Sequence, residues 1–402
     1  MKSRLAVRMQ VLTFAAFAAT MPAVAQERAI EFPDVDGYST FSVDLHTHSV
    51  FSDGMVWPII RMQESERDGL TLMAVTEHLE YQPHRADIPH PDRNRSYAVA
   101  SEYAAEAGSD VIVVNGAEIT RSMPPGHVNA VFISDANALL VETSDADYMI
   151  RLQPSTPEEQ AASEREARHA IEAANEQNAF VFWNHPNWPR QRPDGVARLT
   201  DMHRDLIAEG LLHGIEVANG DFYSAESFQI ALDNDLAILG VSDVHYLIDW
   251  DYMPNDGGHR TVTLVFAEER SAESIKEALH ANRTVAWLGN WLMGREDALM
   301  PLLEASLLLT KVERSLGDEL IDIRLSNVSD AAFDLRVVSG HRFNGPPSTM
   351  RVEPHSDLDL AISGEARTSF EMAFEVLNAF TAPETHPTLR LEVEVAPASS
   401  AE

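Results

Sequence analysis

The chain has 402 residues, more than the roughly 100 to 200 residues of one ordinary domain, so its length predicts two or three domains. It contains no cysteine, which excludes disulfides and thiolate metal sites, so any metal must bind through histidine and carboxylate side chains. The formal charge of −33 at pH 7 repels nucleic-acid backbones and anionic lipid, which argues against a nucleic acid polymer as a partner.

Residues 1–25 have the pattern of a secretory signal peptide. Lys2, Arg4 and Arg8 precede a short apolar run, and small residues that end at Ala25 follow it. The apolar run is shorter than the roughly 20 residues that a membrane span requires, and no other stretch of the chain comes closer. We therefore expect a periplasmic or secreted protein without a membrane span, whose mature chain begins near Gln26.

Residues 26–300 are expected to form an α/β barrel. Continuous apolar runs alternate there with longer segments of helical character that are rich in alanine and glutamate. Runs without polar alternation are typical of strands buried on both faces, as in parallel sheets covered by helices, and a barrel is the economical arrangement for so many of them. The expected strands are FSVDLH, TLMAVTEH, VIVVNGAEI, VNAVFI, AFVFWNH, GIEVAN, LAILGVSDVH and TVTLVFA.

Residues 301–397 show a different texture, in which polar and apolar residues alternate between turn-rich breaks. Short strands with one solvated face indicate an Ig-like antiparallel β-sandwich of about 90 residues. The expected strands are LLLTKVER, ELIDIRLSNV, FDLRVVSG, DLDLAIS, FEMAFEVLN and LRLEVEVAP. We expect the part from about Lys311 to have its own core and to be separable from the barrel.

Histidines and carboxylates lie at the ends of the expected barrel strands. His46 and His48 are two residues apart, so their side chains point the same way on an extended chain, and Asp243 and His245 repeat this spacing. One such histidine alone is more often a hydrogen-bonded structural residue. Because the carboxyl ends of barrel strands meet at one face, several of them together predict a metal site at the mouth of the barrel. Other strands end at His78, Glu118 and His185.

The segments HTHSVFSDG, TEH, GAE, GHVN, NHP and SDVH resemble, in this order, the motifs of the PHP family, which is named for polymerase and histidinol phosphatase domains. The resemblance spans about Phe41 to Asn290 and implies a distorted (β/α)7 barrel with two to three divalent ions, which could be zinc, manganese or iron. The first ion would be bound by His46, His48, Glu118 and Asp243. Glu118 would bridge to a second ion on His127 and His185, and a third ion would be bound by Asp53, His78 and His245.

Two positions depart from this family's usual pattern. Glu77 stands where members often have aspartate, and Asp53 stands where they often have histidine. Glu77 points opposite to His78 on an extended strand, so we expect it to contact and support the ligands rather than to bind an ion. Asp53 gives the third metal site more oxygen character, so we expect its ion to bind less tightly than the other two.

The resemblance implies a metal-dependent phosphoester hydrolase that acts on a small molecule. The expected nucleophile is a hydroxide that bridges the first two ions, with Glu118 and Asp243 as the catalytic residues that hold them. Arg190 and Arg260 are candidate phosphate clamps, because a guanidinium can bind phosphate oxygens bidentately, and each is equally suited to a surface ion pair.

Several functions stay open from the residues alone. A phosphodiester is slightly favoured because no cationic cradle is visible in the sequence, and a phosphomonoesterase of the same family is the main alternative. A non-catalytic metal-containing binding or adhesion module would be indicated by missing ligands, and none is missing. An amidohydrolase reaction would normally use a lysine ligand, which no strand end offers.

Overall fold

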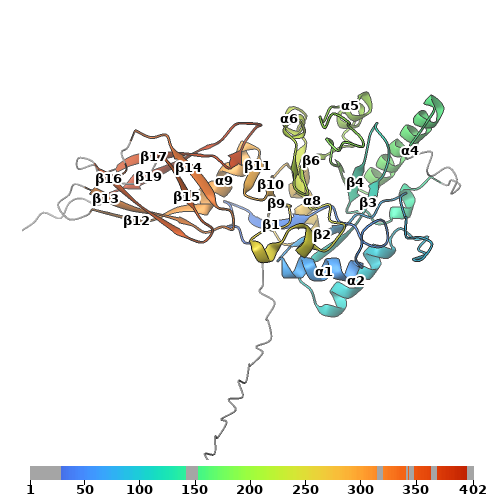
Figure 1. Ribbon diagram of the computed structural model, residues 1–402, viewed down its shortest axis with the longest axis horizontal. Helices are drawn as coiled ribbons and strands as arrows, with labels where there is room; N and C mark the ends of the chain where they lie inside the picture. Colours follow the sequence, from blue (N-terminus) through green and yellow to red (C-terminus); the bar gives the residue numbers. More distant parts are fainter. Residues whose placement is uncertain are drawn as a thin grey trace, which may run out of the picture.

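The computed structural model describes residues 29–141, 153–314, 320–340, 343, 348–363 and 369–395. The expected signal peptide lies outside the described residues. A mixed α/β part, covered by helices, is joined to a smaller all-β part (Figure 1). Among the helices of the described ranges, none combines the length and the apolar character that crossing a membrane requires.

Seven of the described strands form the barrel wall, as the sequence predicts. They are β1 (Ser39–Asp44), β2 (Leu72–Val75), β3 (Ile112–Ile119), β4 (Val128–Val131), β5 (Phe180–Trp183), β6 (Gly214–Asn219) and β8 (Ala237–Val241). They pair in this order, and a bridge between Thr47 and Val244 brings the end of β8 back to the end of β1. Their residues are buried almost throughout, which explains why the runs in the sequence are continuously apolar.

Helices lie in the connections between these strands, and several begin at side-chain caps. Thr156 and Glu159 form a reciprocal capping box at the start of α4, and Ser271 caps α8. The helices are α1 (Pro58–Arg67), α2 (Arg95–Ala107), α4 (Pro157–Glu176), α5 (Asp201–Ala208), α6 (Ala225–Asp233), α7 (Ile248–Asp251), α8 (Ala272–His280) and α9 (Glu296–Ser306), with short 3-10 turns at η1 (Ala136–Leu139) and η2 (Pro254–Asp256).

The sheet is not wholly parallel, which corrects the expectation from the sequence. β4 runs antiparallel to both β3 and β5, because the connection of residues 120–127 is shorter than the roughly 10 to 12 residues of a parallel crossover. β9 (Val262–Ala267) runs antiparallel to β1 and is extended by the hairpin of β10 (Thr284–Leu288) and β11 (Trp291–Gly294). The two-residue turn of this hairpin begins at Gly289 with a φ of 53°.

The C-terminal part is a β-sandwich, as expected. One sheet has the order β12-β13-β16 and the other β15-β14-β17-β19. The strands are β12 (Leu307–Arg314), β13 (Leu320–Asn327), β14 (Phe333–Val337), β15 (Thr349–Val352), β16 (Asp357–Ser363), β17 (Ser369–Val376) and β19 (Thr388–Glu394). Two further short strands lie elsewhere: β7 (Phe222–Tyr223) pairs with β6, and β18 (Ala379–Phe380) joins the barrel sheet beside β11.

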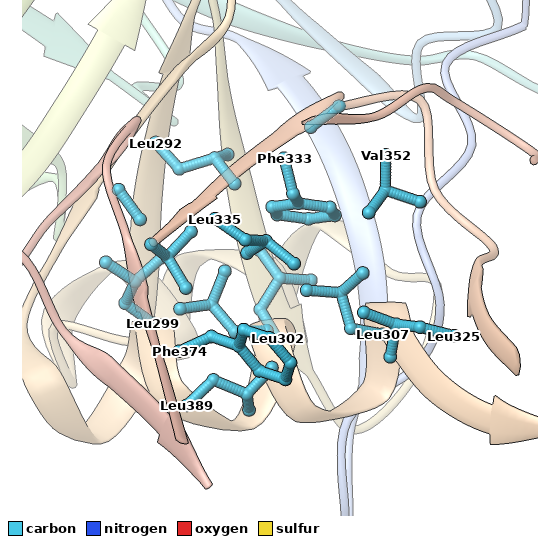
Figure 2. Close-up of a cluster of buried hydrophobic side chains, with 14 of the residues drawn as sticks. Leu292, Leu299, Leu302, Leu307, Leu325, Phe333, Leu335, Val352, Phe374 and Leu389 are labelled. Atoms are coloured by element: carbon cyan, nitrogen blue, oxygen red, sulfur yellow. The ribbon is translucent and has the colours of Figure 1, made fainter. Parts of the chain in front are cut away.

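The sandwich shares one hydrophobic cluster with α9 and with strands β9 to β11 of the barrel sheet, so it does not have the separate core that the sequence predicts. Leu299 and Leu302 of α9 are fully buried in the same cluster as Phe333 and Phe374 of the sandwich (Figure 2). Further members of this shared core are Leu292, Leu307, Leu325, Leu335, Val352 and Leu389. The period-two pattern predicted the strands correctly, but it carries no information about which surface their apolar faces cover.

Candidate metal centre

Strand direction brings the expected ligands to one end of the barrel. His46 and His48 follow β1, and a backbone bridge sets His78, after β2, beside Glu118 near the end of β3. His127 precedes β4 rather than following it. Because β4 is antiparallel to β3, its amino end lies at the same mouth as the carboxyl end of β3.

Two of the expected ligands lie on sharp backbone turns. His185 after β5 has a φ of 27°, and Asp243 after β8 has a φ of 49°, both in the left-handed region that costs a non-glycine residue about 1–3 kcal/mol. Such conformations persist only where the surrounding contacts hold them. Here they turn both side chains back over the end of the barrel, towards Glu118 and His46.

The first group of donor atoms contains the residues expected for the first ion. His46 Nε2 lies 3.0 Å from His48 Nε2, and each is 3.2 Å from Asp243 Oδ1. Glu118 completes the group, since its oxygens lie 3.7 Å from His46 Nε2 and 3.6 Å from His48 Nε2. Two imidazoles and two carboxylates therefore converge from strands β1, β3 and β8.

The second group lies on the other side of Glu118. Glu118 Oε1 is 2.8 Å from His127 Nδ1 and 3.2 Å from His185 Nε2. Asn184 donates a hydrogen bond of 3.0 Å to the same oxygen, which fixes the rotation of the carboxylate. Glu118 therefore contacts both groups and occupies the bridging place that the resemblance implies.

The third group is centred on Asp53. Its Oδ1 lies 3.4 Å from His78 Nε2 and 3.2 Å from His245 Nε2. His48 Nδ1 is 3.8 Å from the same oxygen. The structure thus brings all nine expected ligands together at one mouth. The three groups are not separate from one another, because His48 also approaches Asp53 and His78 Nδ1 lies 2.5 Å from Glu118 Oε2.

Three buried carboxylate oxygens indicate whether the site suits metal ions. Asp53 Oδ1, Glu118 Oε2 and Asp243 Oδ1 are buried and accept no hydrogen bond in the described part of the chain. A buried carboxylate oxygen without a partner costs free energy, which a cation would recover. These oxygens face histidine nitrogens at distances set out above, and a donor set of imidazole and carboxylate suits zinc, manganese or iron. The residues fit divalent ions.

The electrostatics of the centre divide its histidines into two sets. Burial lowers the pKa of every ring, but the neighbouring carboxylates outweigh burial at four of them and raise the pKa of His46, His78, His185 and His245, the last to about 8. Burial lowers the pKa of His48 and of His127 to about 4, so both rings are neutral at pH 7. Burial raises the pKa of Asp53, but the neighbouring His245 and His78 rings outweigh it and hold that pKa well below its usual range. Neutral imidazole and ionised carboxylate are the forms that bind metal.

Arg260 is not available as a phosphate clamp, which corrects the expectation. Its side chain is buried, and its guanidinium donates to Asp68 at 2.7 and 2.9 Å and to Asp44 at 3.3 Å. Asp44 also accepts hydrogen bonds from the backbone and hydroxyl of Ser242, so Arg260 ties the end of β1 to the end of β8. Its charge is neutralised inside the barrel wall.

Arg190 lies on the surface beside the centre. Its guanidinium stacks over the Trp188 ring at 5.4 Å from the ring centroid. That ring in turn lies 5.4 Å from the His127 ring and 5.3 Å from the His185 ring. The Trp188 ring therefore lies between Arg190 and the histidines of the second group. A role of Arg190 in binding the substrate stays a prediction.

Two buried glutamates orient ligands. The sequence predicts a supporting role for Glu77, whereas Glu216 was not recognised. Glu216 of β6 accepts a hydrogen bond of 2.7 Å from His46 Nδ1. Glu77 accepts a hydrogen bond from the Ser52 hydroxyl, which lies 3.2 Å from His48 Nδ1. A signal for Glu216 existed in the sequence, because it is an acidic residue within the otherwise apolar run GIEVAN.

Comparison with known proteins identifies relatives of both parts of the chain. An Ig-like domain family matches residues 309–392. No curated protein matches the chain. A solved structure from Bacteroides vulgatus ATCC 8482, described as a two-domain protein containing a predicted PHP-like metal-dependent phosphoesterase, is 37% identical with a TM-score of 0.79. The match covers 92% of this chain and 99% of that one.

A more distant solved structure, a candidate metal-dependent phosphoesterase from Bifidobacterium adolescentis ATCC 15703, is 19% identical with a TM-score of 0.35. That match covers 50% of this chain and 87% of the other. Because the match to the Bacteroides relative covers 92% of this chain, it extends over both of its parts. By this relationship, the chain belongs to the PHP-like family of metal-dependent phosphoesterases.

Proposed function

We propose that this hydrolase cleaves a small-molecule phosphate ester, with a phosphodiester slightly favoured over a monoester. The observation that carries the proposal is the convergence of three buried carboxylate oxygens, which accept no hydrogen bond in the described residues, with histidine nitrogens around Glu118. Two to three zinc, manganese or iron ions bound there would supply the positive charge that attracts a phosphate and lowers the pKa of a water molecule.

The chain's own residues position this charge. The Glu118 carboxylate lies between the first and second groups, and Asn184 holds its orientation. Asp243 contacts both rings of the first group through one oxygen, while its other oxygen accepts a hydrogen bond of 3.2 Å from Asn219. Water is the proposed nucleophile. Glu118 and Asp243 are the carboxylates that would hold the ions in place, and so would position the water against the phosphorus atom.

The arginine side chains near the mouth of the barrel favour a substrate with a single negative charge. Arg121 is buried in an ion pair with Glu80, and Arg260 is neutralised by its aspartates. Arg190 is exposed on Trp188. A phosphodiester carries one negative charge and a monoester close to two at pH 7, so a mouth whose buried arginines are already paired suits the diester better.

Paired chromogenic substrates test this proposal. The mature chain, loaded with manganese or zinc, should turn over bis(p-nitrophenyl) phosphate with a higher kcat/KM than p-nitrophenyl phosphate. A preference for the monoester would make the protein a phosphatase and would contradict the diester proposal. Metal binding without turnover of either substrate would favour a non-catalytic binding module instead.

The third ion should be separable from the other two. Replacing Asp53 by alanine removes the oxygen at the centre of the third group and leaves the atoms of the first and second groups in place. We expect the bound metal, measured by elemental analysis, to fall by about one equivalent, with a partial loss of turnover that excess metal restores in part.

Asp256 is a matched control, because it is an exposed aspartate at the end of η2. Asp256→Ala should retain the metal content and the rate of the parent chain. If Asp53→Ala kept its full metal content, the third group would not be a metal site.

We also propose that the protein is exported. The support is the pattern of residues 1–25, in which basic residues precede an apolar run and small residues follow. N-terminal sequencing of the protein from its native host should find a chain that begins near Gln26. A cytoplasmic protein with an intact N-terminus would contradict export.

A further inference from the structure

β6 carries a buried carboxylate that is not among the nine ligands. Glu216 is 1% exposed and lies in the middle of this strand. Its Oε1 accepts the hydrogen bond of 2.7 Å from His46 Nδ1. Its Oε2 accepts hydrogen bonds of 2.6 Å from the backbone N–H of His185 and of 2.8 Å from Asn219 Nδ2. One carboxylate therefore contacts residues of both the first and the second group.

The contact with His46 determines which of its nitrogens can bind a metal. With the proton on Nδ1 and directed at Glu216, the lone pair on Nε2 faces His48 Nε2 and Asp243 Oδ1. A carboxylate that accepts from the distal nitrogen of a metal-binding histidine fixes the ring's orientation and increases its basicity. Glu216 thus prepares the first group.

The contact with His185 acts on the backbone. The φ of 27° at His185 is strained, and its N–H is held by Glu216 rather than by a strand partner. The Asn219 side chain, which also donates to Glu216, reaches Asp243 Oδ2 at 3.2 Å, next to the second strained turn. Glu216 and Asn219 together hold both left-handed turns that direct ligands into the centre.

The third group is held differently. His245 Nδ1 lies 2.8 Å from the backbone oxygen of Asp243, and His78 Nδ1 lies 2.7 Å from the Thr120 hydroxyl and 2.5 Å from Glu118 Oε2. The hydrogen bonds of Glu216 in the described part of the chain go to His46, His185 and Asn219. Within the described ranges, Glu216 therefore contacts ligands of the first and second metal positions but no ligand that belongs to the third position alone.

We propose that Glu216 is a positioning residue that couples the first and second metal positions, so that its loss weakens both ions together and leaves the third nearly unchanged. The inference deepens the proposed function, but it concerns ion binding and not the reaction. If the wild-type protein bound its ions but hydrolysed no phosphoester, the proposed function would fail and this inference would remain to be decided by the titration below.

Glu216→Gln is a sharp test because it keeps the shape of the side chain. The carboxylate accepts on both oxygens, from His46 on Oε1 and from His185 and Asn219 on Oε2, whereas an amide offers one acceptor oxygen and one donor NH₂. On the side where the NH₂ lies, two donors would then face each other, or His46 would have to move its proton to Nε2, where it would block the metal. Either arrangement weakens the support of the shared positions.

Cobalt(II) titration of the metal-free full chain, followed by visible absorption and calorimetry, measures the effect. In the Asp53→Ala background, where the first and second positions remain, Glu216→Gln should weaken both ions by about 10- to 100-fold and alter the cobalt spectrum. In the otherwise wild-type chain, Glu216→Gln should change the affinity for the ion at the third position by no more than about threefold.

The matched control is Glu226→Gln, an exposed glutamate on the following helix α6, which should leave all affinities unchanged. Unchanged binding in Glu216→Gln would overturn the proposal, and so would weakening of one ion alone or equal weakening of all three. Should Glu216→Gln fail to fold, Asn219→Ala takes its place. It removes one contact to Glu216 and one to Asp243, and it should weaken the same two ions to a smaller extent.

Discussion

Replacing Glu118 by glutamine should lower turnover by about three orders of magnitude or more. Glu118 is fully buried, and its two oxygens face His127 and His185 on one side and His48 on the other. A single carboxylate is the smallest group that can serve two ions about 3.5 to 4 Å apart. Glutamine removes the charge and one of the two acceptor oxygens, so both ions should bind less tightly. Rates and metal content of the purified variant measure this.

The control for this variant is His169→Ala. His169 is exposed on α4, so its loss should change stability by no more than about 0.5 kcal/mol and leave the rate as it was. Near-normal metal content and rate in Glu118→Gln would mean that Glu118 does not bridge two ions, and the roles of the nine residues would have to be reassigned.

Ending the chain at Ser306 should abolish the folded state. This deletion removes the sandwich and uncovers Leu292, Leu299 and Leu302, each fully buried in the shared core. Full burial of such a side chain contributes about 1.5–3 kcal/mol, so three of them already approach the 5–15 kcal/mol stability of an ordinary domain. We expect insoluble protein or a lost thermal transition, measured by gel filtration and calorimetry.

The deletion also removes β18, which pairs with β11 at the edge of the barrel sheet, and so exposes an unpaired strand. Removing residues 397–402 alone is the control and should not change the Tm. A soluble chain ending at Ser306 with the Tm of the full protein would show that the barrel does not depend on the shared core.

The sequence predicts the strands well because the order of polar and apolar residues in each strand follows the burial of its two faces. A run such as AFVFW is apolar at every position since β5 is covered on both faces, whereas LIDIRL alternates because one face of β13 is more exposed. Strand direction is a different matter. That β4 runs antiparallel follows from the short connection before it, and the β10–β11 hairpin is marked only by Gly289 and Asn290 between two apolar runs.

The sequence likewise predicts some residues of the metal centre and not others. The nine ligands are visible in the sequence because each belongs to a short motif, most of them at a strand end. Arg260 and Glu216 could not be assigned, since the role of a buried charge depends on which partner it meets. Arg260 meets Asp44 and Asp68, which come from distant parts of the chain, and Glu216 meets His46 across the barrel mouth.

Metal dependence of hydrolysis tests the central claim most directly. Metal-free protein, prepared with a chelator, should be titrated with manganese while the turnover of bis(p-nitrophenyl) phosphate is followed. We predict no turnover without metal and a rise that continues through the second equivalent, because the groups on either side of Glu118 must both be filled. Full turnover in the chelated protein, or a maximum reached at one equivalent, would contradict the account.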